Sequence, residues 1–166
     1  MNTATEEVLS ASQSFATNLL TFSAKKAFDK VVSDFERQLG HLDQEKALSN
    51  PVKIPDAVKR MEGASGLMII SILEMDRLLP EFASFGIKSR QYLVGNPLIA
   101  DKMAKFDTLA TLFAPPRVLI FTRNEETCIA YEQPSTTFGR LQSAEISETA
   151  FDLDLKFERL ARAALS

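Results

Sequence analysis

The sequence predicts a single domain in which a few helices pack against one face of a β-sheet. Residues 67–75 and 117–123 are dense in aliphatic and β-branched side chains, which favour strands. Residues 23–40 and 143–164 instead repeat apolar side chains at steps of three and four, the period of an amphipathic helix. A length of 166 residues with 45% hydrophobic side chains suits one compact core, so we expect no second domain.

Composition argues against two classes of partner. The net charge is −3 and 25% of the residues are charged, so the chain lacks the basic excess that nucleic acid backbones require. Its longest apolar run, "LMII" at 67–70, is far shorter than the ~20 residues of a membrane helix. We therefore expect neither nucleic acid nor a membrane as a partner.

Cysteine usage and the first residues indicate a cytoplasmic setting. Cys128 is the single cysteine, which excludes an intramolecular disulfide. Glu6 and Glu7 stand where a secretory signal would carry Lys or Arg before a hydrophobic stretch. Residues 1–14 as a whole are small and polar, and we expect them to form a loosely ordered segment before a domain that spans 15–166.

The first strand and helix are predicted between residues 15 and 40. "FATNLLTF" at 15–22 has the Phe, Thr and Leu content of a strand, with a helix as the alternative. Ser23 occupies the position of an N-cap, and Gly40 occupies the position of a helix stop. Between them, the apolar residues at helical steps are Phe28, Val31, Val32, Phe35 and Leu39.

A long polar connection follows at 41–55 and is interrupted by Asn50-Pro51 and Pro55. Pro55 is expected to open a short helix that ends before two glycines, Gly63 and Gly66. The strand at 67–75 comes next. Because this strand is apolar on both of its faces, it should be covered on both and lie in the middle of the sheet.

The centre of the chain predicts a second strand and helix. Residues 76–86 form a turn or brief helix broken by Pro80, and "KSRQYLVG" at 88–95 is a strand. A helix then begins at Asn96-Pro97, since proline at the first helical position removes only a donor that would lack a partner. Its apolar residues at helical steps are Leu98, Ile99, Met103 and Phe106.

A β-hairpin and a long helix complete the predicted domain. Pro115-Pro116 introduces the strand 117–123, and the turn "NEET" at 124–127 leads to a second strand, "CIAYEQP", at 128–134. Ser143 opens the final helix, which carries Glu near its start and Arg near its end, as the helix dipole favours. Its apolar face consists of Ile146, Ala150, Leu153, Phe157, Leu160, Ala161 and Ala164.

Three of these segments, in this order, resemble the domain of unknown function 302 family. They are "GLMIISILEMDRLL", "SRQYLVGNPLIADKM" and "LFAPPRVLIFTRNEETCIAYEQPS", and the resemblance covers about residues 66–136. Members of the family carry a Gly-Asn-Pro turn before a short aliphatic helix, then a proline-introduced hairpin strand and a second strand that ends in Pro-Ser. The resemblance implies an α+β fold with helices against a largely antiparallel β-sheet, a homodimer, and no established biochemical activity.

The Gly95-Asn96-Pro97 turn has a functional and a structural interpretation. Free N–H groups at the start of the following helix would bind an anion or a polar ligand group, which would make Gly95 and Asn96 ligand-binding residues. In the structural interpretation, Gly permits unusual backbone angles, Asn satisfies neighbouring amides and Pro starts the helix. We favour the structural interpretation, because the stretch lacks the further glycines and the Lys-Ser or Lys-Thr pair of a phosphate-binding loop.

Arg117 and Tyr131 are the other candidate ligand-binding residues, and Arg90 is a third polar group expected on a strand. A guanidinium that faced a concave apolar site would suit a carboxylate or phosphate, and a phenol would add a hydrogen bond. The alternative is an arginine at the rim of the sheet and a tyrosine whose ring is packed and whose hydroxyl is wet.

Metal and covalent chemistry find little support in the sequence. One histidine and one cysteine cannot form a His/Cys zinc site within a subunit, and no acidic series has the spacing of a calcium loop, so we predict no metal and no other cofactor. Cys128 would serve as a nucleophile with His41 as its base only if the fold brought them together, and a packed thiol is the expected alternative. Glu74 and Asp76 could form an acid/base pair, although carboxylates at strand ends are ordinarily solvated.

The predicted helices are too few to cover both faces of the two apolar strands. We therefore hypothesise that the second face of the sheet is buried against a second copy of the chain, in a symmetric homodimer. The predicted function is that of a non-enzymatic binding or structural module. The alternative is a small-molecule sensor or enzyme with a pocket near the Gly95-Asn96-Pro97 turn, assisted by Arg117 and Tyr131.

Overall fold

The strands of the sheet lie in an order that differs from their order in the chain. The computed structural model describes residues 10–166, and within them six strands lie side by side in the order β1-β6-β5-β4-β3-β2. Neighbouring strands are antiparallel except β2 and β3, which are parallel. The strands are β1 (Leu19–Ala24), β2 (Gly40–His41), β3 (Met68–Glu74), β4 (Ser89–Gly95), β5 (Arg117–Arg123) and β6 (Glu126–Glu132).

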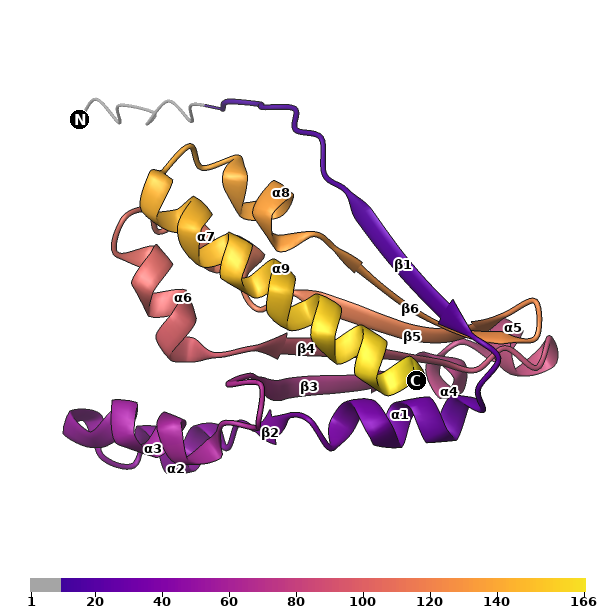
Figure 1. Ribbon diagram of the computed structural model, residues 1–166. Coiled ribbons are helices and arrows are strands. Elements are labelled where there is room, and N and C mark those ends of the chain that lie inside the picture. The colour runs from indigo at the N-terminus through magenta and orange to yellow at the C-terminus, as the bar shows by residue number, and fades with distance from the viewer. Residues whose placement is uncertain (1–9) are drawn as a thin grey trace, which may run out of the picture.

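Helices lie between consecutive strands except β5 and β6, and they cover one face of the sheet, so the predicted single-domain α+β fold with a largely antiparallel sheet is confirmed (Figure 1). Among residues 10–166, no helix combines the length and the apolarity needed to cross a membrane. The helices are α1 (Phe28–Glu36), α2 (Gln44–Leu48), α3 (Ile54–Met61), α4 (Met75–Leu78), α5 (Pro80–Ser84), α6 (Pro97–Ala104), α7 (Ala110–Phe113), α8 (Pro134–Gly139) and α9 (Ala144–Leu165).

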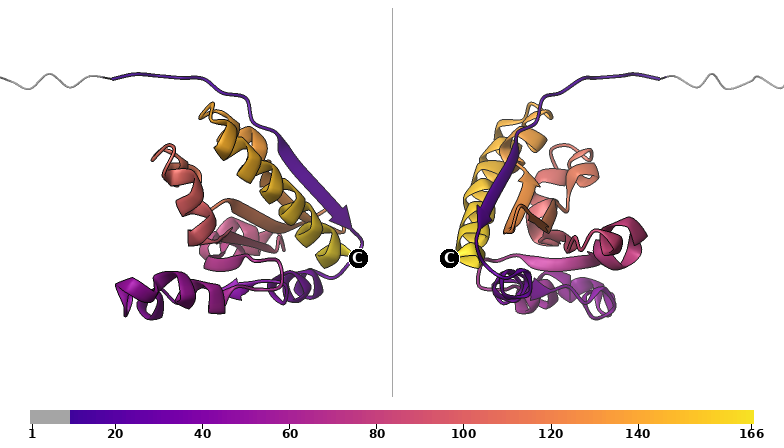
Figure 2. Two further views of the ribbon diagram at one scale, coloured as in Figure 1. Left: turned by 60° about the vertical axis from the view of Figure 1, so that its left-hand side comes forward. Right: turned by 90° about the vertical axis from the view of Figure 1, so that its right-hand side faces the viewer.

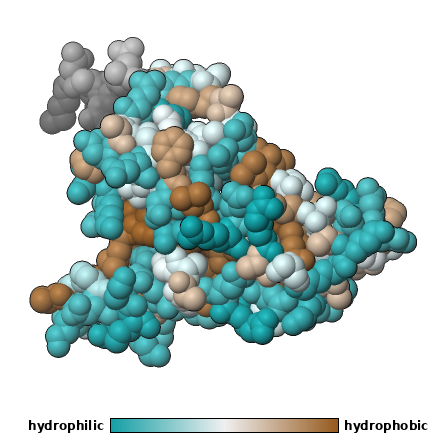
Figure 3. Space-filling model, viewed as in Figure 1, coloured by the Kyte–Doolittle hydropathy of each residue, from teal (hydrophilic) through white to brown (hydrophobic). Residues whose placement is uncertain are grey.

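The hydrophobic core lies between α9 and the face of the sheet that we call the inner face. Helix α9 runs diagonally across this face and meets α1 at its C-terminal end (Figures 1 and 2). The ring of Phe157 on α9 lies 5.4 Å from that of Tyr131 on β6, and Phe35 on α1 lies 5.2 Å from Tyr92 on β4. Burying each such side chain stabilises the fold by about 1.5–3 kcal/mol. Seen from the side of α9, the surface is largely hydrophilic, as expected for the outward faces of amphipathic helices (Figure 3).

Helix α9 begins where the sequence predicts. The Oγ of Ser143 accepts a hydrogen bond from the Ile146 N–H at 3.2 Å, so Ser143 is the N-cap. The seven apolar residues predicted for this helix are all buried. Periodicity therefore identified both the extent of the longest helix and the face that it buries.

Two predicted boundaries of the first helix are wrong. Ser23 is not an N-cap but part of β1, where it pairs with Cys128, and α1 begins after Ala27 without a side-chain cap. Gly40 does not end the helix, which stops at Glu36, but belongs to β2. A Cβ atom at Gly40 would lie 1.7 Å from the Met61 carbonyl oxygen, so glycine is required there by a close approach of two backbones.

The first part of the chain is more structured than predicted between residues 41 and 55. The connection contains α2, whose N-cap Asp43 accepts a hydrogen bond from the Lys46 N–H, and a 3-10 helix at Pro51–Lys53. Pro55 lies in the first turn of α3, as predicted. Strand β1 starts at Leu19, later than predicted, and residues 10–18 form neither helix nor strand. The remainder of the predicted loose N-terminal segment, 1–9, lies outside the described residues.

The hairpin turn between β5 and β6 is shorter than predicted. Arg123 pairs with Glu126, which leaves Asn124 and Glu125 as a two-residue turn with φ angles of 50° and 63°. Such turns match the twist of the flanking strands. Strand β6 therefore covers Glu126–Glu132, and Pro134 starts α8, a helix that the sequence analysis did not predict.

Lys26 links the C-terminal end of α9 to α1 through an ion pair and two hydrogen bonds. Its Nζ lies 2.8 Å from Asp34 Oδ2 and donates hydrogen bonds of 2.9 Å to the carbonyl oxygens of Ala164 and Ser166. Asp34 is 9% exposed and also pairs with Lys30. Hydrogen bonds from Lys26, and then from Lys30, lower the pKa of Asp34 to about 2.

The stability of the fold should fall in acid as Asp34 is protonated. Its folded pKa is below the ordinary value of 3.8, so its contribution is complete above pH 3.8 and is lost as the pH falls through about 2. We expect Asp34→Asn to lower the free energy of unfolding near neutral pH and to flatten its decline in this acid range, as measured by urea denaturation. Asp29→Asn, which removes a carboxylate that is 80% exposed on the same helix, is the matched control and should have little effect. An Asp34→Asn protein as stable as the wild type at neutral pH would contradict this role.

Candidate functional site

The predicted Gly95-Asn96-Pro97 turn joins β4 to α6. A Cβ atom at Gly95 would lie 3.1 Å from the Cβ of Pro115, so glycine allows the two segments to pack closely. Asn96 is the N-cap of α6, and its Oδ1 accepts a hydrogen bond from the Leu98 N–H at 2.9 Å. Pro97 lies in the first turn of α6, as predicted.

The polar groups of this turn are already used by the protein. The Nδ2 of Asn96 donates to Glu62 Oε1 and to the Gly66 carbonyl oxygen, both at 2.8 Å, and Asn96 is 7% exposed. Burial tends to raise the pKa of Glu62, but hydrogen bonds from Lys59 and Asn96 outweigh it and lower the pKa overall. An ionised carboxylate thus lies beside the start of α6, where an external anion would otherwise bind. These contacts support the structural interpretation of Gly95 and Asn96.

A small apolar cavity of about 300 Å³ lies beside this turn, between β3, α6 and the segment 114–116. The cavity offers few free polar groups to a ligand, because the side chain of Asn96 is already hydrogen-bonded to Glu62, Gly66 and Leu98. The cavity is lined by Leu42, Gln44, Ile70, Asn96, Pro97, Ile99, Ala100, Met103, Thr111, Ala114, Pro115, Pro116, Phe138 and Leu153.

Arg117 and Tyr131 do not converge on one site. Tyr131 pairs with Val118 and points to the inner face, where its ring stacks at 6.1 Å from Phe22. Its hydroxyl is buried without a hydrogen-bond partner among residues 10–166, and burial, reinforced by the charges of Glu158 and Asp154, raises its pKa. Arg117 precedes Val118 on β5 and therefore points to the opposite face, which we call the outer face.

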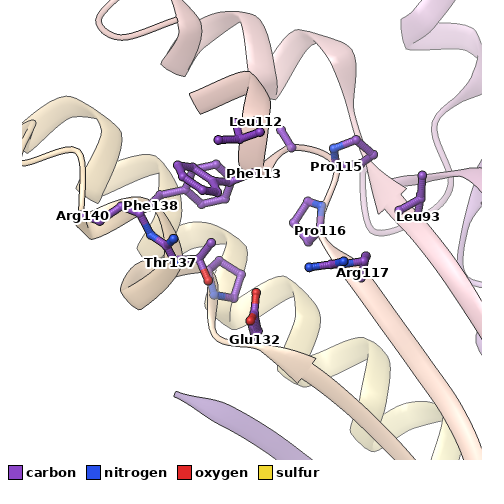
Figure 4. A pocket seen from close by; sticks show the side chains of 12 residues that line it. Leu93, Leu112, Phe113, Pro115, Pro116, Arg117, Glu132, Thr137, Phe138 and Arg140 are labelled. Atoms are coloured by element: carbon purple, nitrogen blue, oxygen red, sulfur yellow. The ribbon is translucent and has the colours of Figure 1, made fainter. Parts of the chain in front are cut away.

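Arg117 instead lines a different cavity, shown in Figure 4, which we call the arginine pocket. The pocket has a volume of about 560 Å³ and lies where the ends of β4 and β6 and the start of β5 meet α7 and α8. Its lining residues are Leu93, Leu112, Phe113, Ala114, Pro115, Pro116, Arg117, Glu132, Pro134, Thr137, Phe138 and Arg140.

A second guanidinium, that of Arg140, is held in the arginine pocket by aromatic rings. Its Cζ lies 4.4 Å from the ring centroid of Phe113 and 5.4 Å from that of Phe15. Its Nε is buried and has no hydrogen-bond partner among residues 10–166. Among residues 10–166, neither Arg117 nor Arg140 forms an ion pair, although the carboxylate of Glu132 also lines the pocket.

Thr137 on α8 adds a second buried polar group without a partner. The residue is 7% exposed, and its Oγ1 makes no hydrogen bond within residues 10–166. A buried hydroxyl in this state costs about 1–3 kcal/mol. In a helix, threonine usually bonds the carbonyl four residues back. Here the carbonyl oxygen of Gln133 already accepts from the N–H groups of Thr136 and Thr137 and from the Thr136 hydroxyl at 2.9 Å.

Helix α9 fixes the position of α8 and hence of these two groups. The carboxylate of Asp154 accepts hydrogen bonds from the Ser135 N–H at 2.8 Å and from Gln133 Nε2 at 2.9 Å. Asp154 therefore satisfies polar groups in the first turn of α8. No pattern in the sequence points to Thr137 or Arg140. The alternation of residues along a strand was the one available sign that Arg117 and Tyr131 face opposite ways.

The remaining candidates for catalysis are kept apart or engaged elsewhere. Cys128 lies on β6 and His41 on β2, at nearly opposite sides of the sheet. Glu74 binds Arg77 and Arg90, and the hydrogen bond from Arg77 lowers the pKa of Glu74 despite its partial burial. Arg90 also donates to Glu36 at 3.3 Å, and so ties α1 to the sheet. Within residues 10–166, no three His, Cys, Asp or Glu side chains are placed to hold a metal ion.

Comparisons with known proteins give a family and a fold. A family model described as "Domain of unknown function DUF302" matches residues 46–164. The crystal structure of an uncharacterized conserved protein DUF302 from Bacillus stearothermophilus is similar with a TM-score of 0.65 at 15% identity, covering 88% of this chain and 97% of that chain. Among proteins with curated descriptions, none matches the sequence. At this identity the structural similarity establishes the fold alone.

Asn96→Ala should destabilise the fold. The change removes the cap of α6 and leaves the Gly66 carbonyl and the Glu62 carboxylate without their shared donor. We expect the free energy of unfolding in urea to fall by about 2–3 kcal/mol. Asn50→Ala is the matched control, because Asn50 caps the exposed 3-10 helix through Val52 and makes no buried contact. Equal losses in the two variants would show that the buried bonds of Asn96 contribute nothing beyond a surface cap.

Cys128 should react slowly with thiol reagents in the native protein. The residue is 1% exposed, and burial raises the pKa of its thiol, so little thiolate is present to attack. We expect the native rate with a chromogenic disulfide reagent to be at least roughly 100-fold below the rate in urea, where the thiol is accessible. The single cysteine makes the assay unambiguous. Similar rates in the two states would identify Cys128 as a reactive thiol.

Proposed function

The chain belongs to the DUF302 family of domains of unknown function, and from this premise we propose that it is a non-enzymatic binding or structural module that works as a homodimer. The observation that carries the proposal is the outer face of the sheet, on which Leu73 is exposed and Leu119 is half-buried. A second copy is the partner that best fits such a face, because a symmetric dimer buries the same patch on both subunits.

One cross-strand row on the outer face supports this partner. The strand pairings align Leu73, Gln91, Leu119, Ala130 and Thr21 in this row. Leu73 is 43% exposed and Leu119 is half-buried, whereas Val118 and Ile120, which point inward from the same strand, are 1% and 0% exposed. Burying leucine side chains that project from a sheet is favourable by about 25 cal/mol of free energy for each Å² of apolar surface removed from water. Their burial in a dimer would therefore contribute to association.

The state of the polar candidates supports a role without covalent chemistry. Burial raises the pKa of the Cys128 thiol and of the Tyr131 hydroxyl, so both groups keep their protons near neutral pH. A nucleophile or general base needs the opposite shift. A single buried thiol also suits a reducing compartment, and we propose a cytoplasmic setting for this module.

A small-molecule sensor is the second candidate. It is favoured by the apolar cavity of about 300 Å³ beside Asn96 and Pro97, which is at the lower end of the volumes of ligand sites. In this function the Gly95-Asn96-Pro97 turn would serve as part of the cavity wall, and Arg117 and Tyr131 would not take part. A ligand that binds there would raise the melting temperature, which a purely structural module would not require.

Leu73→Glu tests the proposed dimer. The wild-type protein should sediment as a dimer at micromolar concentration. The variant places two like charges in a symmetric interface, and we expect its dissociation constant to rise at least about 100-fold, equivalent to roughly 3 kcal/mol. Leu73 is partly exposed in a single copy, so the variant should keep its fold, which circular dichroism checks.

Leu155→Glu is the matched control for this experiment. Leu155 is 54% exposed on α9, away from the sheet, so the same substitution should leave the sedimentation coefficient unchanged. A wild-type monomer at these concentrations, or a dimer that survives Leu73→Glu, would remove the outer face as the interface.

A further inference from the structure

Two of the three buried side-chain polar atoms that lack a hydrogen-bond partner among residues 10–166 belong to the arginine pocket, and the third is the Tyr131 hydroxyl on the inner face. Elsewhere, buried polar side chains such as Asn96 and Asp34 are bonded by neighbouring groups. In the pocket, the Thr137 hydroxyl and the Arg140 Nε are buried and lack a partner among residues 10–166. Native proteins leave few such groups unpaired, and those that remain call for an explanation. One such explanation is a ligand that forms the missing hydrogen bonds.

We propose that the arginine pocket binds a small organic monocarboxylate that has an apolar body. The proposal goes beyond the dimer and does not depend on it. The carboxylate would accept hydrogen bonds from the Arg140 guanidinium and from the Thr137 hydroxyl, and Arg117 on the other side of the pocket would contribute positive charge. The body would lie against the apolar wall, which includes Phe113 and Phe138.

The geometry of Arg140 suits a carboxylate. Its guanidinium lies over the Phe113 ring, 4.4 Å from the ring centroid, and 5.4 Å from the centroid of the Phe15 ring, so two aromatic side chains limit its position. Stacking occupies the faces of a guanidinium and leaves the N–H groups at its edge available. Those donors form a fork that matches the two oxygens of a carboxylate. Figure 4 shows Arg117, Glu132, Thr137 and Arg140 around the same hollow.

Charge and size limit the ligand further. The pocket carries two arginines and one carboxylate, Glu132, so a ligand with one negative charge balances it. A phosphate dianion would bring two charges close to Glu132, which is unfavourable. The volume of about 560 Å³ lies in the range of sites for small organic ligands. Proline and phenylalanine side chains in the wall provide contacts for an aromatic or aliphatic body.

The proposal is tested by calorimetric titration of the full chain with two matched probes. Phenylacetate carries the carboxylate on an apolar body, and phenylacetamide has the same shape without the charge. We expect saturable binding of phenylacetate and binding of phenylacetamide that is at least about tenfold weaker, because charge-assisted hydrogen bonds are about twice as strong as neutral ones. Hexanoate should bind as well, since the carboxylate group is the shared determinant.

Variants then assign the binding to the pocket. We expect Arg140→Met to weaken phenylacetate binding about 10–100-fold and Thr137→Val to weaken it about 3–10-fold. Thr137→Val preserves the shape of the side chain and removes an unpaired hydroxyl, so the melting temperature without ligand should not fall. This variant decides the outcome if Arg140→Met does not fold. Arg60→Met is the charge-matched control, because Arg60 is exposed on α3, outside the pocket, and forms no ion pair within residues 10–166.

Several results would overturn the proposal. One is the absence of saturable binding of phenylacetate and of hexanoate up to about 10 mM, a concentration at which even a weak site would be occupied. Another is equal affinity for phenylacetate and phenylacetamide. Full binding by Thr137→Val and Arg140→Met would place the ligand elsewhere. Binding of inorganic phosphate without binding of either carboxylate would replace the assigned ligand class. The same titration on Leu73→Glu separates this proposal from the dimer, because loss of the dimer alone should leave Thr137 and Arg140 in place.

Discussion

The cover that α9 gives to the inner face of the sheet is the constraint on which the rest of the structure depends. The apolar stripe of this helix buries Phe157 against Tyr131, and one turn earlier the same helix presents Asp154 to the start of α8. The C-terminal end is held by the hydrogen bonds from Lys26. Because α9 is fixed along its whole length, α8 is fixed too, and Thr137 and Arg140 take their positions from it. The packing of the core thus sets the geometry of a pocket that lies outside it.

Local patterns in the sequence predicted the elements whose formation depends on local physics. The apolar periodicity of residues 146–164 and the N-cap Ser143 gave α9 correctly, and Pro97 and Asn96 gave the start of α6. The errors occur where contacts distant in sequence decide. Gly40 was predicted to end a helix, but its glycine is required by the close approach of the Met61 backbone. Ser23 was predicted to be an N-cap, but it pairs with Cys128 of β6 as part of a strand. The two-residue strand β2 exists because β3 pairs with it.

The candidate site was predicted less well than the fold, for a related reason. Arg117 was selected as a polar residue on a strand, and it does line a cavity, but with Arg140 and Thr137 rather than with Tyr131. Nothing near Arg140 in the sequence reveals that Phe113 and Phe15 will enclose its guanidinium. The unpaired state of Thr137 depends on the crowding of one carbonyl oxygen, that of Gln133, within a helix that was itself not predicted. Conversely, the Gly95-Asn96-Pro97 turn was a candidate ligand site, but the side chain of Asn96 is hydrogen-bonded to Glu62 and Gly66 within the protein.

The outer face and the arginine pocket are neighbours, and this relates the two proposals. Leu93 pairs with Arg117 in the cross-strand row next to that of Leu73 and Leu119, and alternate residues along a strand are about 7 Å apart. A second copy on the outer face would therefore lie close to the mouth of the pocket. If a bound carboxylate contacted that copy, the ligand would strengthen the dimer by the same factor by which the dimer strengthened ligand binding, since coupling free energies are reciprocal. Thr137 and Arg140, however, belong to the region of α8 rather than to the sheet, so the pocket keeps its donors in a single copy. Under the two proposals, ligand binding would therefore not require the second copy.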